Sequence, residues 1–294
     1  MAEEGAGFRL DRPGVRAAFD RAGGTYESAA RLQQQVAQEL LSRLETFRFE
    51  PRVVLDLGAG TGRATAELKR RYPRAQVLAL DLSLGMLTEA KRNLRLWRRF
   101  ARVCADAQRL PLQAGSVDLV FSSLMLQWCQ PLDAALSEVR RVLRPEGFFA
   151  FSTFGPATLQ ELRRAWAAAD DYNHVNHFID VHDVGDALVR AGFSEPVLDV
   201  DRIELGYADA LALMRDLKAI GAHNVTAGRP RTLLGRAHLA RMQAAYERER
   251  TNGVLPATYE VIYGASWGNR ARLAASVSAG EAHIAPGAIG RRAR

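Results

Sequence analysis

The segment from Val53 to Gly62, with the sequence VVLDLGAGTG, constrains the fold more than any other part of the chain. Its first half is a short apolar run that is typical of a buried strand, and its second half is a glycine-rich turn. The glycines permit a tight turn and let the backbone approach a ligand closely. Because a helical pattern begins at Arg63, the segment predicts a strand, a ligand-binding loop and a helix in succession.

Short apolar runs alternate with helical patterns along most of the chain. Strands are expected at 53–57, 76–80, 102–105, 117–121, 148–154, 196–205 and 257–263. Helices are expected at 63–72, 84–96, 132–143, 158–169, 181–191, 207–220 and 235–250. Buried apolar runs separated by helices are typical of a parallel sheet that is covered on both faces. The predicted fold class is therefore α/β, a Rossmann-like, doubly wound and mostly parallel sheet of seven strands.

Helical segments flank and interrupt this sheet. Residues 1–50 are expected to form an N-terminal helical cap, because apolar side chains recur every fourth position from Leu32 to Leu44. Residues 51–268 are expected to form the main domain. Helical patterns within about 207–252 predict an insertion between the last two strands, where it is suited to cover a ligand site as a lid.

Positive charge is concentrated near the C-terminal end of the chain. The net charge is +7, and residues 269–294 contribute +4 of it, with five arginines against one glutamate. This tail has no apolar periodicity and is expected to be disordered. The remainder is nearly balanced and has no basic run interleaved with aromatic residues, so nucleic acid is not an expected partner.

The apolar and cysteine content excludes further classes of protein. No stretch approaches the roughly 20 apolar residues that span a bilayer, and the N-terminal residues lack the apolar run of a secretory signal. We therefore expect a cytoplasmic protein without membrane contact, and a monomer. The two cysteines, Cys104 and Cys129, cannot form a disulfide framework and are expected to be free thiols.

Acidic residues mark the first three predicted strands. Asp81 follows Gly60 by 21 residues, a spacing that lets a carboxylate accept hydrogen bonds from both hydroxyls of a ribose. Asp106 can accept from an adenine amino group, and Asp56 can meet an amino-acid ammonium group through water. Because the loop lacks the G-x-G-x-x-G of dinucleotide-binding folds, these features together predict an S-adenosylmethionine site. The expected cofactor-binding residues are Asp56, Gly58, Ala59, Gly60, Asp81, Leu82, Asp106, Ala107, Ser122 and Gln127.

With these motifs, residues 53–155 resemble class I S-adenosylmethionine-dependent methyltransferases. The flanking segments are similar to those of the malonyl-acyl-carrier-protein O-methyltransferase family of biotin synthesis. They are FDRA at 19–22 with Tyr26, FGPATLQEL at 154–162, HFIDVHDVG at 177–185, LKAIGAHN at 217–224 and LPATYEVIY at 255–263. The resemblance covers roughly residues 14–268, so the C-terminal tail lies outside it.

The resemblance implies methylation of the free carboxylate of malonate carried as a thioester on acyl carrier protein. S-adenosylmethionine is then the methyl donor and S-adenosylhomocysteine the product. Because a carboxylate is already ionised at neutral pH, no general base is required. Tyr26 matches a tyrosine that closes over the cofactor in related enzymes.

Two further roles follow from that reaction. A cation must hold the malonyl carboxylate, and Arg229 and Arg231 are candidates together with His174 and His177. The residues predicted to act in catalysis are Tyr26, Arg229 and His177. Acyl carrier protein is acidic, so a basic docking surface is expected at Arg163, Arg164, Arg215 and Lys218. No metal is expected, because the histidine spacing at 174, 177 and 182 is unlike a tetrahedral zinc site and no cysteine accompanies it.

Three alternatives remain open at this point. A related mitochondrial assembly factor for respiratory complex I, thought to hydroxylate an arginine of a partner subunit, shares the fold and the Pro-Ala-Thr-Tyr strand. Methyltransferases of other small molecules, such as quinone precursors, share the cofactor motifs but lack the patterns at 217–224 and 255–263. A non-catalytic scaffold that binds the cofactor is the third alternative.

Overall fold

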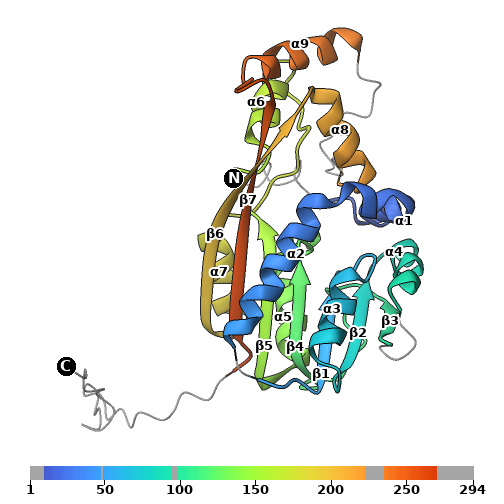
Figure 1. Cartoon of the computed structure of the whole chain (residues 1–294). Coiled ribbons are helices and arrows are strands. Elements are labelled where there is room, and N and C mark those ends of the chain that lie inside the picture. The colour runs from blue at the N-terminus through green and yellow to red at the C-terminus, as the bar shows by residue number, and fades with distance from the viewer. Residues whose placement is uncertain (1–9, 48, 95–98, 223–234, 270–294) are drawn as a thin grey trace, which may run out of the picture.

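A computed structural model gives the structure of the chain and describes residues 10–47, 49–94, 99–222 and 235–269 (Figure 1). Within them, seven strands form one sheet in the order β3-β2-β1-β4-β5-β7-β6. The strands are β1 (Val53–Leu57), β2 (Gln76–Asp81), β3 (Ala101–Cys104), β4 (Val117–Ser123), β5 (Leu143–Phe154), β6 (Ser194–Tyr207) and β7 (Leu255–Trp267). The first five strands are parallel, and β7 is antiparallel to both of its neighbours. The predicted α/β class with a mostly parallel sheet of seven strands is confirmed.

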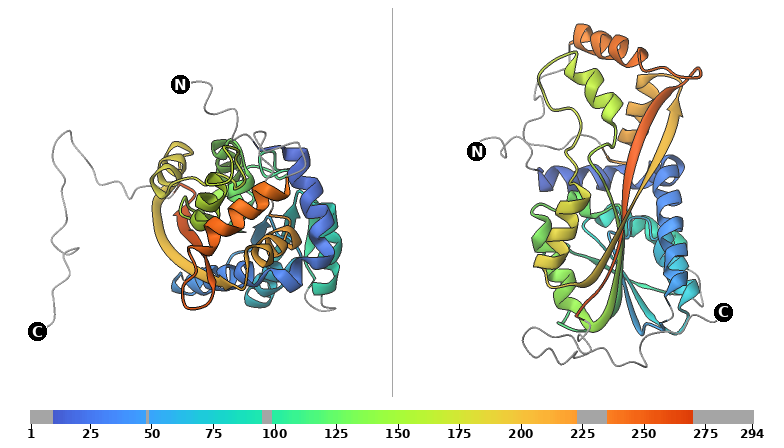
Figure 2. Two further views of the ribbon diagram at one scale, coloured as in Figure 1. Left: turned by 90° about the horizontal axis from the view of Figure 1, so that it is seen from above. Right: turned by 90° about the vertical axis from the view of Figure 1, so that its left-hand side faces the viewer.

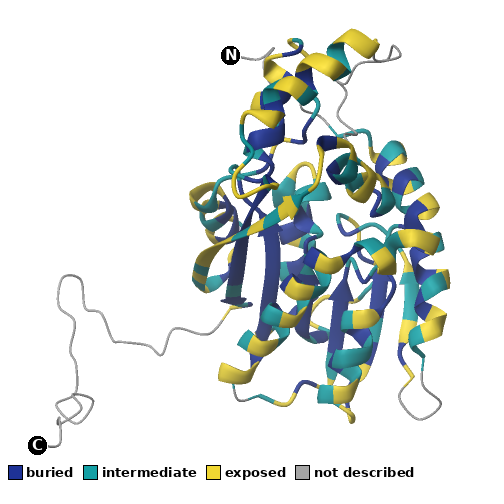
Figure 3. Cartoon of the chain, turned by 45° about the horizontal axis from the view of Figure 1, so that its top comes forward, coloured by how far each residue is buried: buried dark blue, intermediate teal, exposed yellow. Residues whose placement is uncertain are grey.

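Helices cover both faces of the sheet, as Figures 1 and 2 show. They are α1 (Arg12–Ala29), α2 (Arg31–Arg43), α3 (Arg63–Arg71), α4 (Leu84–Glu89), α5 (Leu132–Val142), α6 (Gln160–Ala167), α7 (Val181–Arg190), α8 (Ala210–Ala219) and α9 (Arg236–Glu247). Val54 belongs to the core layer under α2 and α3, whereas Leu55 belongs to the layer under α5 and α7. Successive strand residues point to opposite faces, so each apolar run fills both layers. Figure 3 shows the strands buried beneath helices whose outer surfaces are exposed.

The boundaries of several elements differ from the prediction, and β5 and α4 are two examples. β5 begins at Leu143, which pairs with Val117, and the register then shifts so that Leu119 pairs with Phe148. The strand expected at 148–154 is therefore longer and contains an irregularity. The helix expected at 84–96 ends sooner, because α4 passes into a 3-10 turn after six residues.

β6 and β7 extend far beyond the rest of the sheet. Their pairing runs from Ser194 opposite Trp267 to Tyr207 opposite Leu255, and Figure 1 shows α6, α8 and α9 around the upper half of this ladder. Helices α8 and α9 lie in the segment between the two strands. This segment corresponds to the insertion expected at about 207–252, and its role as a lid stays a prediction.

The two N-terminal helices lie at different places on the sheet. α2 packs against β4 and β5, whereas α1 crosses above the carboxyl ends of the strands and contacts α4 and α8 (Figure 1). The Thr25 hydroxyl donates to the carbonyl of Ala219 at the end of α8, over 2.9 Å. Both helices lie within residues 1–50, and the role of this segment as a cap stays a prediction. The tail expected at 269–294 lies, except for Asn269, outside the described residues.

No helix in the described ranges is long and apolar enough to cross a membrane.

Candidate functional site

The glycine-rich loop after β1 is held in place by the neighbouring strand. The amides of Gly58 and Ala59 both donate to the carbonyl oxygen of Leu80, over 2.8 and 3.0 Å. Gly58 and Gly60 have φ angles of 79° and 53°, in the left-handed region that favours glycine. A Cβ atom on Gly58 would lie 2.3 Å from the side chain of Met125, whereas one on Gly60 would meet no atom within 4 Å. The loop therefore presents bare backbone to open space beside Gly60.

Asp81, the last residue of β2, faces this loop. Its Oδ2 atom accepts a hydrogen bond from the amide of Gly60, and its Oδ1 atom accepts one from the amide of Ser83, both over 2.8 Å. Burial raises the pKa of Asp81 above its ordinary value, and the charge of Asp20 adds to this, while the amides oppose it. The carboxylate thus links two loops and retains lone pairs for a ligand.

Asp106 follows β3 and faces the N-terminal helix. Its Oδ1 atom accepts a hydrogen bond from the amide of Gln108 over 2.9 Å. Its Oδ2 atom accepts from the guanidinium group of Arg12 at the start of α1, in an ion pair. The first turn of α1 is thereby connected to the loop after β3.

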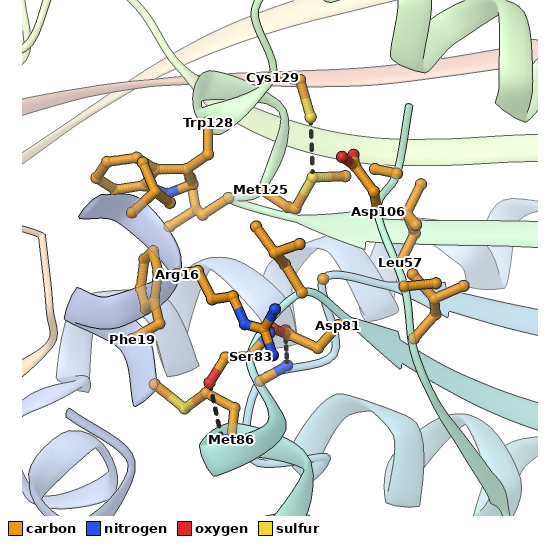
Figure 4. A pocket seen from close by; sticks show the side chains of 18 of the residues that line it. Arg16, Phe19, Leu57, Asp81, Ser83, Met86, Asp106, Met125, Trp128 and Cys129 are labelled. Atoms are coloured by element: carbon orange, nitrogen blue, oxygen red, sulfur yellow. Dashed lines mark hydrogen bonds between the residues drawn. The ribbon is translucent and has the colours of Figure 1, made fainter. Parts of the chain in front are cut away.

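One pocket of about 840 Å³, its open mouth included, lies where these loops meet (Figure 4). It contains seven of the residues predicted from the sequence, which are Tyr26, Gly58, Gly60, Asp81, Leu82, Asp106 and Ala107. These residues come from α1 and from the ends of the first three strands. The carboxyl ends of parallel strands are where α/β sheets bind ligands.

Four other predicted residues lie behind the pocket and do not line it. Asp56 is buried and accepts a hydrogen bond from the Thr65 hydroxyl over 2.5 Å. The Ser122 hydroxyl donates to the carbonyl of Leu57 over 2.9 Å, and the neighbouring Ser123 lines the pocket instead. Ala59 and Gln127 are the other two residues, and the Gln127 amide donates to the carbonyl of Leu124 over 2.6 Å. Among the described residues, these four support the loops around the pocket.

Besides Tyr26, helix α1 supplies pocket residues to which the sequence analysis gave no individual role. Arg16 and Phe19 line the pocket, and the Phe19 ring meets the Trp128 ring edge-on at a centroid distance of 5.2 Å (Figure 4). Asp20 anchors the helix, because its Oδ1 atom accepts from the Ser83 hydroxyl over 2.6 Å and from the Gly85 amide over 3.0 Å. In the sequence, the motif FDRA at 19–22 contributed to the family resemblance, but it did not indicate which of its residues face the pocket.

Tyr26 lines the same pocket from the last turns of α1. Burial raises the pKa of Tyr26, and the nearby charges of Asp81 and Glu27 raise it further. The phenol is therefore protonated at neutral pH, and it can donate a hydrogen bond but cannot act as a base.

Of the four residues predicted to hold the malonyl carboxylate, the structure describes only the two histidines. Arg229 and Arg231 lie outside the described residues. The His174 ring stacks on Trp166 at 3.8 Å and contacts Asp170 over 2.7 Å, so it has a packing role. The Nδ1 atom of His177 lies 3.0 Å from the carbonyl oxygen of Phe178, and His177 is not part of the pocket. Desolvation and the charge of Arg163 lower the pKa of His177, so its ring is neutral at neutral pH.

The four basic residues predicted to dock a carrier differ in their surroundings. The Arg163 guanidinium is half-buried and donates to the carbonyls of Pro156 and Thr158, over 3.0 and 2.9 Å. Arg164 is exposed and forms an ion pair with Glu249. Arg215 and Lys218 are exposed on α8. No cluster of three or more potential metal ligands occurs among the residues that the structure describes.

Comparison with known proteins agrees with this geometry. Residues 55–151 match the family model described as a methyltransferase domain. A putative methyltransferase from Bacillus halodurans has a similar structure, with a TM-score of 0.56 and 16% identity, over 79% of this chain and 98% of that chain. A second similar structure, the YcgJ protein from Bacillus, gives a TM-score of 0.54 at 15% identity, over 78% of this chain and 97% of that chain. At such identities the likeness concerns the fold alone.

Curated relatives are much closer in sequence. A malonyl-[acyl-carrier protein] O-methyltransferase from Methylovorus is 54% identical over 274 residues, which are 91% of this chain and 92% of the relative. One from Laribacter hongkongensis is 54% identical over 273 residues, or 90% of this chain and 92% of the relative. With this identity over nine-tenths of both sequences, the chain belongs to the malonyl-[acyl-carrier protein] O-methyltransferase family.

Proposed function

We propose that this chain transfers a methyl group from S-adenosylmethionine to the free carboxylate of malonyl-acyl carrier protein and thereby forms a malonyl methyl ester. The observation that carries the proposal is the 54% identity to relatives of that name over nine-tenths of the chain. This identity extends well beyond the methyltransferase domain at 55–151. The alternatives of an arginine hydroxylase or of a methyltransferase for other small molecules have no comparable support.

The pocket fits the proposed cofactor. Asp81 offers carboxylate lone pairs to a ribose, and Gly60 leaves space for it, since a Cβ atom there would meet nothing within 4 Å. Asp106 also lines the pocket, and we propose that it accepts from the adenine amino group. Leu82 and Ala107, which follow these two carboxylates in the sequence, line the pocket as well. When bound, S-adenosylmethionine supplies a methyl group that its own positive sulfur activates.

The remaining chemistry requires positioning and the exclusion of water. A malonyl carboxylate is ionised at neutral pH, so the enzyme needs no base. Tyr26 is protonated and lies on the helix that covers the pocket, and we propose that it closes the site and donates a hydrogen bond there. We retain Arg229 and His177 as proposed contacts of the malonyl carboxylate.

Carrier docking is proposed for the exposed cations of α8. Arg163 is occupied by two backbone carbonyls, and Arg164 is paired with Glu249. Arg215 and Lys218 are exposed, and neither forms an ion pair with a carboxylate among the residues that the structure describes. We further propose that the enzyme acts as a monomer in the cytoplasm, early in biotin synthesis.

Mass spectrometry of malonyl-acyl carrier protein tests the proposed reaction. After incubation with the protein and S-adenosylmethionine, the carrier should gain the mass of one methylene unit on its malonyl group. Carrier with an acetyl group is the matched control and should not change, because it has no free carboxylate. An unchanged malonyl carrier at saturating cofactor would contradict the proposal, and addition of one oxygen atom to a protein partner would support the hydroxylase alternative.

The buried carboxyl group of Asp56 should make cofactor affinity depend on pH. Burial raises the pKa of Asp56 to about 7, with a smaller contribution from Asp81, while the hydrogen bond from Thr65 opposes the shift. If the carboxylate form meets the cofactor's ammonium group, affinity should increase about tenfold from about pH 6 to about pH 8, with proton release on binding. Calorimetry in two buffers of different ionisation enthalpy measures this release. The Asp56→Asn variant should lose this component, and an unaltered pH profile in that variant would refute the assignment.

A further inference from the structure

A second pocket lies on the other side of the junction between α1 and α2. It occupies about 820 Å³, its open mouth included. Its walls come from the start of α2, the upper end of β6, one face of α8 and Tyr259 of β7. It shares no lining residue with the first pocket.

The two pockets are neighbours along α1. Tyr26 lines the first pocket and Ala29 lines the second. These residues are three positions apart on α1, and residues at that spacing are neighbours on one helix surface. Tyr259 connects the second pocket to the sheet, because its ring lies 5.8 Å from that of Phe154, the last residue of β5. The second pocket therefore lies next to the edge of the sheet where the methyl donor is proposed to bind.

The lining of this pocket combines aliphatic and hydrogen-bonding groups. Its aliphatic residues are Leu32, Leu205, Leu217 and Ile220. The hydroxyl groups of Tyr207 and Tyr259 lie close to each other, Tyr207 also lies close to the carboxylate of Asp216, and the side chain of Gln33 adds an amide. Burial raises the pKa of both tyrosines, so these hydroxyl groups are protonated at neutral pH. A ligand with alternating aliphatic and amide portions suits such a lining.

One cation lines this pocket, and two more lie on the outer face of α8. Arg31 lines the pocket and is exposed at the start of α2. Arg215 and Lys218 are exposed on α8, whose residues Asp216 and Leu217 line the pocket. Guanidinium and ammonium groups bind phosphate oxygens and attract acidic proteins.

We infer that the second pocket receives the phosphopantetheine arm on which acyl carrier protein presents its acyl group. The arm consists of a phosphodiester, a dimethyl-bearing carbon, two amides and methylene groups, and it ends in the thioester. Arg31 meets the phosphodiester, the aliphatic and amide portions contact the walls, and the thioester end lies beside Ala29, one helical turn from Tyr26. The carrier itself rests against Arg215 and Lys218. This inference rests on the proposed function.

Filling the pocket provides the kinetic test. Leu217→Trp should raise the KM for malonyl-acyl carrier protein about tenfold or more, because the indole occupies the space of the arm. The kcat/KM for malonyl-N-acetylcysteamine, a thioester without most of the arm, should stay unchanged, as should the affinity for S-adenosylhomocysteine. Val189→Trp is the control, since Val189 lies on α7, is 61% exposed and does not line the pocket. Equal losses with both thioesters, or no loss with either, would overturn the inference.

Malonyl-coenzyme A separates recognition of the arm from recognition of the carrier. It carries the same pantetheine chain without the protein, so Leu217→Trp should impair its methylation as well. Reversing charge with Arg215→Glu and Lys218→Glu together should raise the KM for the carrier substrate alone. A loss confined to malonyl-coenzyme A in this double variant would contradict the assigned carrier contact.

Thiol exchange tests the same pocket without any methyl transfer. A carrier whose arm ends in a thiopyridyl disulfide should react with the Leu217→Cys variant about tenfold faster than with Val189→Cys, because binding raises the local concentration of the arm. The new thiolate forms the mixed disulfide with the arm and displaces pyridine-2-thione. The unsubstituted chain, with Cys104 and Cys129, gives the background. Equal rates in a protein that methylates malonyl-acyl carrier protein would refute the inference, whereas absence of that methylation would refute the proposed function.

Discussion

Replacing Asp81 by alanine is expected to weaken the binding of S-adenosylmethionine by about 100-fold or more. The carboxylate is placed to make two charge-assisted hydrogen bonds to a ribose, and each contributes about 1.5–3 kcal/mol. A loss of about 3 kcal/mol corresponds to about 100-fold in the dissociation constant. The substitution also releases the amides of Gly60 and Ser83, which Asp81 now holds over 2.8 Å. Titration calorimetry with S-adenosylhomocysteine measures the effect.

Two further variants define the cause of that loss. Asp81→Asn keeps the shape and one acceptor oxygen, so a smaller loss of about tenfold is expected. Asp199→Asn is the matched control, because Asp199 lies on β6, pairs with Arg43 and does not line the pocket. It should leave the affinity unchanged. Wild-type affinity in Asp81→Ala would show that the ribose does not bind there.

The Gly264→Ala substitution is expected to destabilise the fold by about 3 kcal/mol. Gly264 on β7 is paired with Phe151 on β5, and a Cβ atom at this glycine would lie 2.1 Å from the Phe151 ring. That ring is fully buried and stacks on Phe149 at 4.8 Å, so it has little room to move. The midpoint of urea denaturation and the melting temperature should both fall.

Gly24→Ala is the matched control for this prediction. Gly24 lies within α1, and a Cβ atom there would meet nothing within 4 Å. Because alanine favours the helix over glycine, a gain of about 0.5–1 kcal/mol is expected. An unchanged denaturation midpoint in Gly264→Ala would mean that the Phe151 ring can move aside at little cost.

The central α/β elements could be predicted because their signals are local. The run at 53–57 and the glycines after it determine β1 and its loop over a few residues, and both lie where they were expected. The ends of strands were harder to predict, because pairing with distant residues sets them. β7 continues to Trp267, beyond the expected 257–263, since its last residues pair with β5 and β6.

Apart from Tyr26, the predicted residues that line the pocket come from the ends of the strands. Asp81 and Asp106 follow strands, so their place at the edge of the sheet follows from topology. The contribution of α1 depends on contacts between residues far apart in sequence, such as Asp20 with Ser83 and Phe19 with Trp128. His174 was a candidate to hold the malonyl carboxylate because of its residue type. In the structure its ring contacts Trp166 and Asp170 and has a packing role, which the sequence does not reveal.

The pairing of Tyr207 with Leu255 has a consequence for how such chains diverge. The segment between them leaves the ladder and returns to it at adjacent positions, so its length and sequence can vary without strain in the sheet below. The groups proposed to face the methyl donor lie on other segments, namely α1 and the loops after β1 to β4. Exchange of this one segment can therefore alter part of the proposed acceptor pocket, on α8, without touching the donor half, and the same cut points suit the grafting of α8 and α9 between relatives.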